Sequence, residues 1–278
     1  MKAIFDKVSN DCSEITTKSY STSFSLGIKI LDKSLHNPIY GIYGFVRFAD
    51  EIVDSFHNYN KKELFNKYKS DTYLAIKNKI SLNPIINSFQ EVVNKFKIDH
   101  TLIESFLNSM EMDLEDQNYD ENTYKKYILG SAEVVGLMCL TIFVNGDQNI
   151  FNKLKPYAMK LGSAFQKINF LRDLNDDYKT LGRSYFPEVN MENFSESDKL
   201  KIENEIENEF IEGLKGIRML PNTSKGGVYL AYKYYYNLFK KIKNIPAHKI
   251  LEKRSRISNF GKLITLLSSM IRYHLKRI

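Results

Sequence analysis

The sequence predicts an all-α fold in a single domain that covers residues 1–278. Only six prolines occur, and the long intervals between them mostly show the apolar periodicity of helices. Alternating strand patterns bounded by hairpin turns are lacking. Hydrophobic residues make up 43% of the chain, which suffices for a sizeable core, and nothing in the sequence resembles a linker between two cores.

The expected helices follow one another with short connections. A hydroxyl-rich segment, TKSYSTSFSLGIKIL, follows the first helix, and Pro38 lies near the start of the next one, where proline is tolerated. Gly130 and Gly136 predict close helix packing, with room for a ligand as the alternative. In order, we expect helices over residues 6–19, 40–56, 61–79, 84–96, 100–114, 122–144 and 157–179.

The segment Tyr40 to Phe56, YGIYGFVRFADEIVDSF, carries the first acidic motif. On a helix, one face of about 100° holds Tyr43, Val46, Arg47, Asp50 and Asp54. The segment is apolar nearly all round, which predicts a buried helix. A buried carboxylate pairs with a cation, binds a metal or becomes neutral. An ion pair with Arg47 and a metal site are both open interpretations of this motif.

A second acidic motif lies in residues 157–179. One stripe is apolar and comprises Leu161, Ala164, Ile168, Leu171, Leu174 and Tyr178. The opposite stripe comprises Gly162, Gln166, Asn169, Asp173 and Asp177. Such a polar stripe is typical of a surface helix, but a solvated face in this lysine-rich chain should include lysine, and none lies in line. The composition of the stripe therefore favours a functional face.

The two motifs together indicate divalent metal and phosphate chemistry. Arginine is rare, and three of the eight arginines lie in or beside the motifs: Arg47, Arg172 and Arg183. The guanidinium fork binds carboxylates and phosphates bidentately. Mg²⁺ uses a few carboxylates and keeps waters that phosphate oxygens can replace. A diphosphate near the carboxylates and a long hydrocarbon in the apolar interior fit this arrangement.

Composition limits the remaining function classes. Cys12 and Cys139 have no CxxC spacing, which suits a reducing cytosol and argues against a disulfide or zinc framework. No leader-like segment and no run of 18 apolar residues occur, so we expect a cytoplasmic chain that contacts membranes peripherally. The net charge of +7 favours weak attraction to anionic surfaces such as lipid headgroups. No nucleic-acid-binding motif accompanies that charge, so we expect no nucleic-acid partner.

Four segments carry a resemblance to a known family. YGFVRFADEIVD and QKINFLRDLNDDYKTLGRSYFP resemble the two signature segments of the squalene/phytoene synthase family, the head-to-head prenyl transferases. YSTSFSLG resembles the family's N-terminal serine-and-phenylalanine motif, and YILGSAEVVGLM its small-residue helix. The resemblance covers most of the chain and implies an isoprenoid (terpene) synthase-like helical bundle with a central apolar cavity.

The resemblance implies roles for individual residues. Asp50, Asp54, Asp173 and Asp177 would hold Mg²⁺, with Mn²⁺ as an alternative ion, and thereby chelate the diphosphates. Tyr43 and Arg47 would belong with them to the catalytic group. The substrate-binding residues implied in the same way are Ser21, Ser23, Phe24, Gln166, Asn169, Arg172, Arg183, Tyr185 and Tyr235.

The chain departs from the family pattern at three positions. Glu51 replaces the second aspartate of a common pair and keeps its charge, Leu129 stands where some members carry tyrosine, and Glu133 stands where a small residue is frequent. The implied activity is a phytoene synthase that acts on geranylgeranyl diphosphate. The alternatives are a squalene or dehydrosqualene synthase that uses farnesyl diphosphate, and a non-catalytic binding or assembly protein.

Overall fold

The structure, a computed structural model, describes residues 1–115, 119–181, 185–187, 189, 194–251 and 257–274. In the helical stretches 175–181 and 272–274, and at positions 259, 260 and 263, it describes the backbone alone. No strand occurs among these residues, which confirms the all-α prediction. Asp177 therefore lies on a described helix without a described side chain, and Arg183 lies outside the described residues.

The helices are α1 (Lys2–Tyr20), α2 (Thr22–Ile30), α3 (Lys33–Asp54), α4 (Lys61–Asn78), α5 (Pro84–Phe96), α6 (His100–Met112), α7 (Glu121–Ile128), the π-helical turn η1 (Leu129–Glu133), α8 (Val134–Phe143), α9 (Gln148–Leu181), α10 (Glu196–Met219), α11 (Asn222–Lys243), α12 (Ala247–Ile250) and α13 (Asn259–His274).

Sequence periodicity placed five of the seven expected helices within a few residues. The expected ranges 61–79 and 84–96 match α4 and α5 closely, whereas the ranges 40–56 and 157–179 began too late. Helix α3 starts at Lys33, so Pro38 lies inside it and not at its start. Helix α9 starts at Gln148 and runs through Pro156. The carboxylate of Asp147 accepts hydrogen bonds from the amides of Asn149 and Ile150, at 2.9 and 3.0 Å. This cap starts the helix, which continues through Pro156 although a proline there removes one backbone hydrogen bond and crowds the carbonyl four residues earlier.

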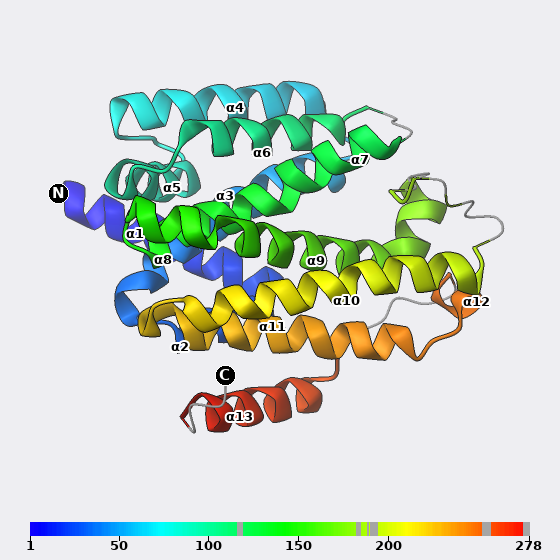
Figure 1. Cartoon of the computed structure of the whole chain (residues 1–278). Coiled ribbons are helices and arrows are strands. Elements are labelled where there is room, and N and C mark those ends of the chain that lie inside the picture. The colour runs from blue at the N-terminus through cyan, green and yellow to red at the C-terminus, as the bar shows by residue number, and fades with distance from the viewer. Residues whose placement is uncertain (116–118, 182–184, 188, 190–193, 252–256, 275–278) are drawn as a thin grey trace.

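Helix α9 runs through the middle of the bundle and packs against α10, α8, η1 and α11 (Figure 1). Helices α4, α5 and α6 lie on one side of it, and α10 and α11 on the other. Three apolar clusters fill the interior of the described bundle, and the first two in chain order are the larger ones. In the first, the buried ring of Phe45 stacks on Phe89 with 3.7 Å between centroids. In the second, Ile168 and Leu171 of α9 are fully buried beside Phe210 of α10.

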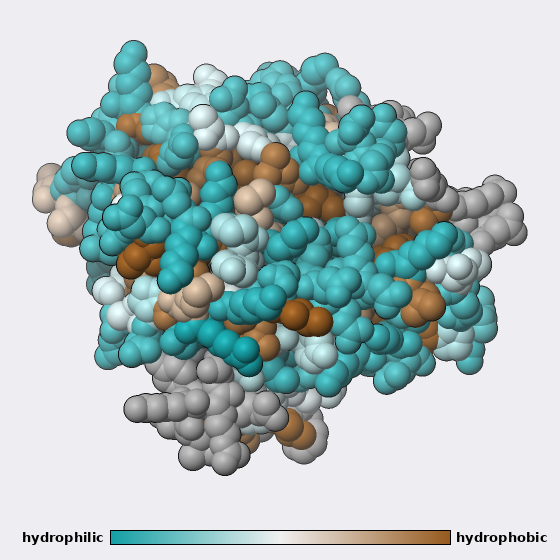
Figure 2. Space-filling view, viewed as in Figure 1, coloured by the Kyte–Doolittle hydropathy of each residue, from teal (hydrophilic) through white to brown (hydrophobic). Residues whose placement is uncertain are grey.

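The space-filling view shows hydrophilic residues over most of one face, with apolar ones between them singly or in small groups (Figure 2). Within the described part of the chain, one helical segment, Glu121–Phe143, is long and apolar enough to cross a membrane. Half of its most apolar window is buried inside the bundle, where η1 and α8 pack against α6 and α9. A core helix meets the same criterion.

Candidate active site

An apolar cavity of about 300 Å³ lies between α2, α3, α9, α10, α11 and the η1–α8 segment. Its walls include Ile42, Val46, Val135, Leu161 and Ile217. The small residues of the η1–α8 segment provide both close helix packing and space in the cavity, the two roles considered from the sequence. A Cβ on Gly130 would lie 2.5 Å from the Cβ of Ser109 on α6, so this glycine allows close helix packing, whereas Gly136 lines the cavity.

One end of the cavity is polar, and we define this polar end by Tyr43, Gln166, Asn169 and Tyr235. The hydroxyl of Tyr235 donates a hydrogen bond to Oδ1 of Asn169 at 3.4 Å, and the Asn169 amide donates to Gln166 Oε1 at 3.4 Å. The ring of Phe24 lies 5.6 Å from that of Tyr43 and 6.0 Å from that of Tyr235. Five sequence-predicted site residues from four helices thus meet at one place.

The tyrosines of the polar end are phenols rather than phenolates. Burial raises the pKa of Tyr43 to about 12, and the nearby Tyr235 raises it further. The charge of Arg47 and a hydrogen bond with Ser21 oppose this rise in the pKa of Tyr43. Burial also raises the pKa of Tyr235. Tyr235 stacks on Phe165 with 4.0 Å between ring centroids. At neutral pH the polar end therefore presents hydroxyl groups and π faces, which can stabilise a cation.

Aspartates follow the cavity wall on two helices. On α3, Val46 lines the cavity and Asp50 follows four residues later. On α9, Asn169 lines the cavity and Asp173 follows four residues later. Four residues are about one helical turn, with a rise of about 6 Å, so each aspartate lies on the cavity-facing side of its helix, one turn beyond the polar end. Asp54 lies a further turn along α3.

The carboxylate of Asp50 is paired with Arg47, whose Nη1 lies 2.5 Å from Asp50 Oδ2. The same guanidinium also bonds to Glu51 and lies over the ring of Tyr20, 4.3 Å from its centroid. The side chain of Asp50 is 33% exposed, so the expectation of a fully buried carboxylate was wrong. The helix ends at Asp54, and the residues after it are exposed, so this end of α3 leaves the packed interior.

The carboxylate of Asp173 is held by a bidentate pair. Arg172 Nε and Nη2 donate to its two oxygens at 2.9 and 2.5 Å. Such paired hydrogen bonds fix both groups in orientation. Among the side chains that the structure describes, no three metal-binding residues gather at one point. In this structure Asp50 and Asp173, the two described aspartates closest to the cavity, are each paired with an arginine.

Other sequence-predicted site residues lie in different surroundings. Ser21 caps α2 by accepting a hydrogen bond from the Phe24 amide at 3.2 Å, and Ser23 is half-buried on the same helix without lining the cavity. Tyr185 is buried in the second apolar cluster, where its ring stacks on Phe170 with 4.2 Å between centroids. Leu129 is 37% exposed and does not line the cavity.

Sequence reasoning missed two features of the cavity wall. The π-helical turn η1 places Ser131 in the wall, with a buried hydroxyl that has no hydrogen-bond partner in the described part of the chain. Such turns occur often at functional sites. Gly162 of α9 packs against this turn, because a Cβ there would lie 2.9 Å from the carbonyl oxygen of Ala132. No periodic pattern distinguishes a π turn from an α-helix.

A buried ionic cluster joins α9 to α10 beside the cavity. Lys167 Nζ lies 2.9 Å from Glu209 Oε1 and 2.5 Å from Glu205 Oε1. Ser163 also donates to Glu209, at 3.0 Å. Burial, with a contribution from Glu209, raises the pKa of Glu133 to about 7. The polar residues of α9 thus divide between the cavity and a salt-bridged interface with α10.

The comparisons with known proteins agree with this geometry. The family model for squalene/phytoene synthase matches residues 17–261. The chain is 25% identical to a 4,4'-diapophytoene synthase of Staphylococcus haemolyticus, covering 67% of this chain and 65% of that protein. It is 28% identical to a phytoene synthase of Cereibacter sphaeroides, covering 64% and 51%, and 27% identical to a presqualene diphosphate synthase of Zymomonas mobilis, covering 68% and 64%. The chain thus spans between half and two thirds of these relatives.

Solved structures show the same fold. A dehydrosqualene synthase with a bound ligand superposes with a TM-score of 0.83 at 20% identity, covering 98% of both chains. A squalene synthase of Alicyclobacillus acidocaldarius gives 0.75 at 17% identity, covering 86% of this chain and 95% of that one. With a helical bundle of this architecture, acidic motifs that follow the walls of one apolar cavity, and a family model that matches most of its length, the chain belongs to the squalene/phytoene synthase family.

Proposed function

We propose that this protein is a phytoene synthase, which joins two geranylgeranyl diphosphates head to head through a cyclopropyl (prephytoene) diphosphate to give phytoene in carotenoid biosynthesis. The observation that supports this most is the apolar cavity with Asp50 and Asp173 one turn beyond its polar end. A hydrocarbon chain fits the apolar part of the cavity. A diphosphate fits the region of Asp50 and Asp173, which we call the charged end. The match to the family model supports the same reaction class.

The reaction needs two ionisations and two proton losses. In the first half, one prenyl diphosphate loses diphosphate, its allylic cation is attacked by the double bond of the second, and a proton leaves to close the cyclopropane ring. In the second half, the cyclopropyl diphosphate loses diphosphate, rearranges and gives up a proton. The apolar walls would exclude water from both cations, and the rings of Tyr43, Tyr235 and Phe165 would face them.

Magnesium is the ion we propose for the charged end. Asp50, Asp54, Asp173 and Asp177 would hold it, because carboxylate oxygens are the ligands that Mg²⁺ prefers. When bound, the ion would neutralise the departing diphosphate and so lower the barrier to ionisation. The arginine pairs support this role, since Arg47 and Arg172 hold the carboxylates in position and present guanidinium groups that also bind phosphate oxygens.

The choice of the C20 substrate rests on similarity to phytoene synthases, among them those of Cereibacter sphaeroides and Arthrospira platensis, at 28% and 27% identity. The alternative is a C15 substrate, as the names of the diapophytoene and presqualene diphosphate relatives suggest. The end of the cavity away from the polar end would decide between the two lengths, because its depth is set there by large side chains such as Phe143, Leu154 and Leu220.

The test is incubation of the purified protein with Mg²⁺ and either C15 or C20 prenyl diphosphate, with and without NADPH, followed by mass spectrometry of the extracted hydrocarbon. A C40 hydrocarbon from the C20 substrate is the expected product. A C30 product from the C15 substrate alone would replace the proposal with the alternative. No hydrocarbon and no magnesium-dependent diphosphate release would favour a non-catalytic binding protein.

Variants test the proposed metal site separately. We expect Asp50→Asn and Asp173→Asn each to abolish turnover while the helical circular dichroism spectrum is retained. Asp71→Asn is the matched control, because Asp71 is 37% exposed and paired with Lys67 on the surface of α4. Substantial activity in either site variant, or an equal loss in the control, would contradict the assignment.

A further inference from the structure

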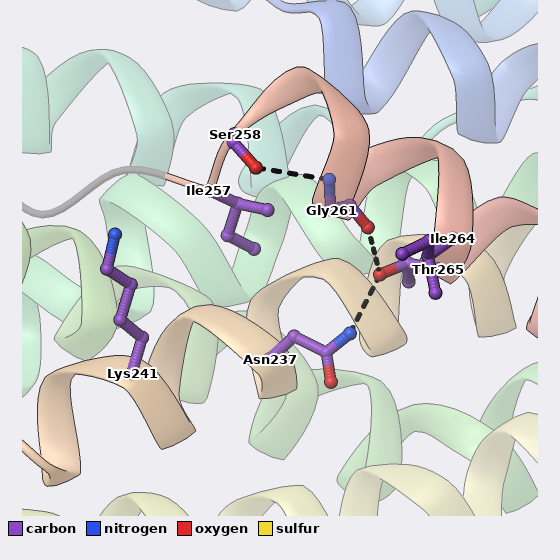
Figure 3. Close-up of a pocket in the computed structure, with 7 residues that line it drawn as sticks. All are labelled: Asn237, Lys241, Ile257, Ser258, Gly261, Ile264 and Thr265. Carbon is purple, nitrogen blue, oxygen red and sulfur yellow. Dashed lines mark hydrogen bonds between the residues drawn. The ribbon is translucent and has the colours of Figure 1, made fainter.

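Helix α13 is attached to the bundle by its polar side. It lies outside the main body against α11 (Figure 1). Among its described side chains, the buried ones are Thr265 and Ser269, which are 4% and 3% exposed. Asn237 of α11 donates a hydrogen bond to Thr265 Oγ1 at 2.8 Å, and that hydroxyl donates to the Gly261 carbonyl at 2.8 Å (Figure 3). An open cleft of about 690 Å³ separates parts of the two helices.

Away from Thr265 and Ser269, α13 exposes large aliphatic side chains, of which Ile264 also lines the edge of the cleft beside α11. Ile264, Leu267, Met270 and Ile271 are 51%, 53%, 38% and 59% exposed. At about 100° per residue, Ile264, Leu267 and Ile271 fall within about 60° of one another and about 150° from the buried pair of hydroxyl residues. We call these four residues the α13 apolar stripe. A helix that buries hydroxyl groups and exposes large aliphatic side chains is inverted relative to a soluble surface helix.

Positive charge is concentrated in the same part of the sequence. Residues 253–278 contain no Asp or Glu and seven basic residues: Lys253, Arg254, Arg256, Lys262, Arg272, Lys276 and Arg277. These seven account for the whole formal net charge of +7, because the rest of the chain has 33 basic and 33 acidic residues. An apolar stripe within a basic segment is the pattern of helices that lie in the interface of anionic membranes.

The position of α13 connects this surface to the cavity. Tyr234 donates a hydrogen bond to the Lys262 carbonyl at 2.9 Å, and its neighbour Tyr235 belongs to the polar end. Lys262 Nζ donates to the hydroxyl of Thr22, at the start of α2 and next to Ser21. A membrane on the α13 apolar stripe would therefore lie on the side of the molecule where α2 and α11 form the cavity wall.

We propose that the α13 apolar stripe is a membrane-docking surface, which seats the protein on an anionic lipid leaflet with the polar end of the cavity close to it. The link to substrate entry rests on the proposed function, since prenyl diphosphates and their hydrocarbon products reside in lipid. A second copy of the chain fits less well. One helix stripe is small for a dimer interface, which buries about 800 Å² per partner, and two copies of the basic segment would repel each other.

Sedimentation with lipid vesicles tests the proposal on the full-length protein without substrate. We expect binding to vesicles of phosphatidylcholine mixed with phosphatidylglycerol, and weaker binding to phosphatidylcholine alone. The triple variant Ile264→Ser, Leu267→Ser and Ile271→Ser should bind on the order of 10- to 100-fold more weakly. The matched control is Leu74→Ser, Leu200→Ser and Ile211→Ser, because those side chains are 55%, 53% and 52% exposed on α4 and α10. The control should bind like the parent protein.

The absence of tryptophan from the sequence allows a second measurement. In Leu267→Trp, the only indole of the protein would lie on the α13 apolar stripe, and its emission should shift to the blue when anionic vesicles are added. In Leu200→Trp it should not shift. Equal binding of the triple variant and the parent, or no shift for Leu267→Trp, would overturn the proposal.

Two further outcomes separate the alternatives. Equal binding to both vesicle types would overturn the choice of an anionic surface, and a concentration-dependent dimer that the triple variant loses, without vesicle binding, would assign the stripe to a second copy. None of these measurements uses catalysis. A protein that binds vesicles but makes no hydrocarbon would thus refute the proposed function alone, and an active protein that ignores vesicles would refute the docking surface alone.

Discussion

Replacing Lys167 by methionine tests whether the ionic cluster between α9 and α10 supports the wall of the cavity. Lys167 is 3% exposed and Glu209 4%, so the substitution leaves a buried carboxylate without its nearest cation. Breaking a buried pair in this way costs about 3–5 kcal/mol. The second partner, Glu205, has a 55% exposed side chain, so its loss adds at most about 1 kcal/mol.

Two contacts to Glu209 remain after the substitution. Ser163 donates to it at 3.0 Å, and Lys160 approaches it at 3.3 Å from a side chain that is 53% exposed. Because these two contacts still stabilise the Glu209 carboxylate, we expect a loss at the lower end of the 3–5 kcal/mol range, about 3 kcal/mol of unfolding free energy. For a chain of this size that corresponds to a decrease of about 6–12 °C in Tm.

The assay is urea unfolding followed by circular dichroism, with Lys167→Met, Glu209→Gln and the double variant measured together. Because both single changes disrupt the same pair, the cost of the double variant should fall short of the sum of the two by at least about 1 kcal/mol. A Lys167→Met protein within about 0.5 kcal/mol of the parent, or strict additivity, would show that the pair does not stabilise this interface.

Three further predictions concern the surroundings of the cavity. Because burial raises the pKa of Glu133 to about 7 from an ordinary value of 4.5, the folded state binds more protons than the unfolded chain between those values, and this residue reduces stability as pH rises. The stability of Glu133→Gln relative to the parent should rise by about 3 kcal/mol from pH 4 to pH 8 in urea unfolding, and a constant difference would contradict this. Gly162→Ala should cost about 1–3 kcal/mol, because the new Cβ would lie 2.9 Å from the Ala132 carbonyl, and should lower Tm more than Gly136→Ala, whose nearest such contact is 3.3 Å. Ser21→Ala should cost about 1 kcal/mol through loss of the α2 cap, and an unchanged Tm would refute that role.

The acidic motifs could be predicted because the information lies within single helices. Spacing alone placed Tyr43, Val46 and Asp50 on one face of α3, and the structure puts the first two in the cavity wall. The lack of lysine beside Asn169 and Asp173 correctly indicated that the stripe on α9 is not a solvated surface. Both inferences needed only the angle per residue and the chemistry of the side chains.

What the sequence could not provide depends on contacts between helices. Lys167 follows Gln166 directly, yet it points to carboxylates that come from α10, about 40 residues later. A single-helix pattern assigns such a lysine to solvent, because lysine is rarely buried without a partner. The same limit applies to Tyr185, whose place among the rings of the second cluster depends on where the chain after α9 returns to the bundle.

The charge of the chain illustrates a different limit, since the relevant signal is present in the sequence but is hidden by averaging. Over the whole chain, lysines alternate with acids, and a net charge of +7 describes a weakly basic surface. Counted from residue 253 onward, the same charge belongs to one segment without a single carboxylate. Helical periodicity of residues 259–274 shows two sides but does not say which one faces the bundle. The contact of Thr265 with Asn237 supplies that orientation. It shows that the hydroxyl side of α13 faces α11, which lines the cavity, and that the aliphatic side chains are exposed.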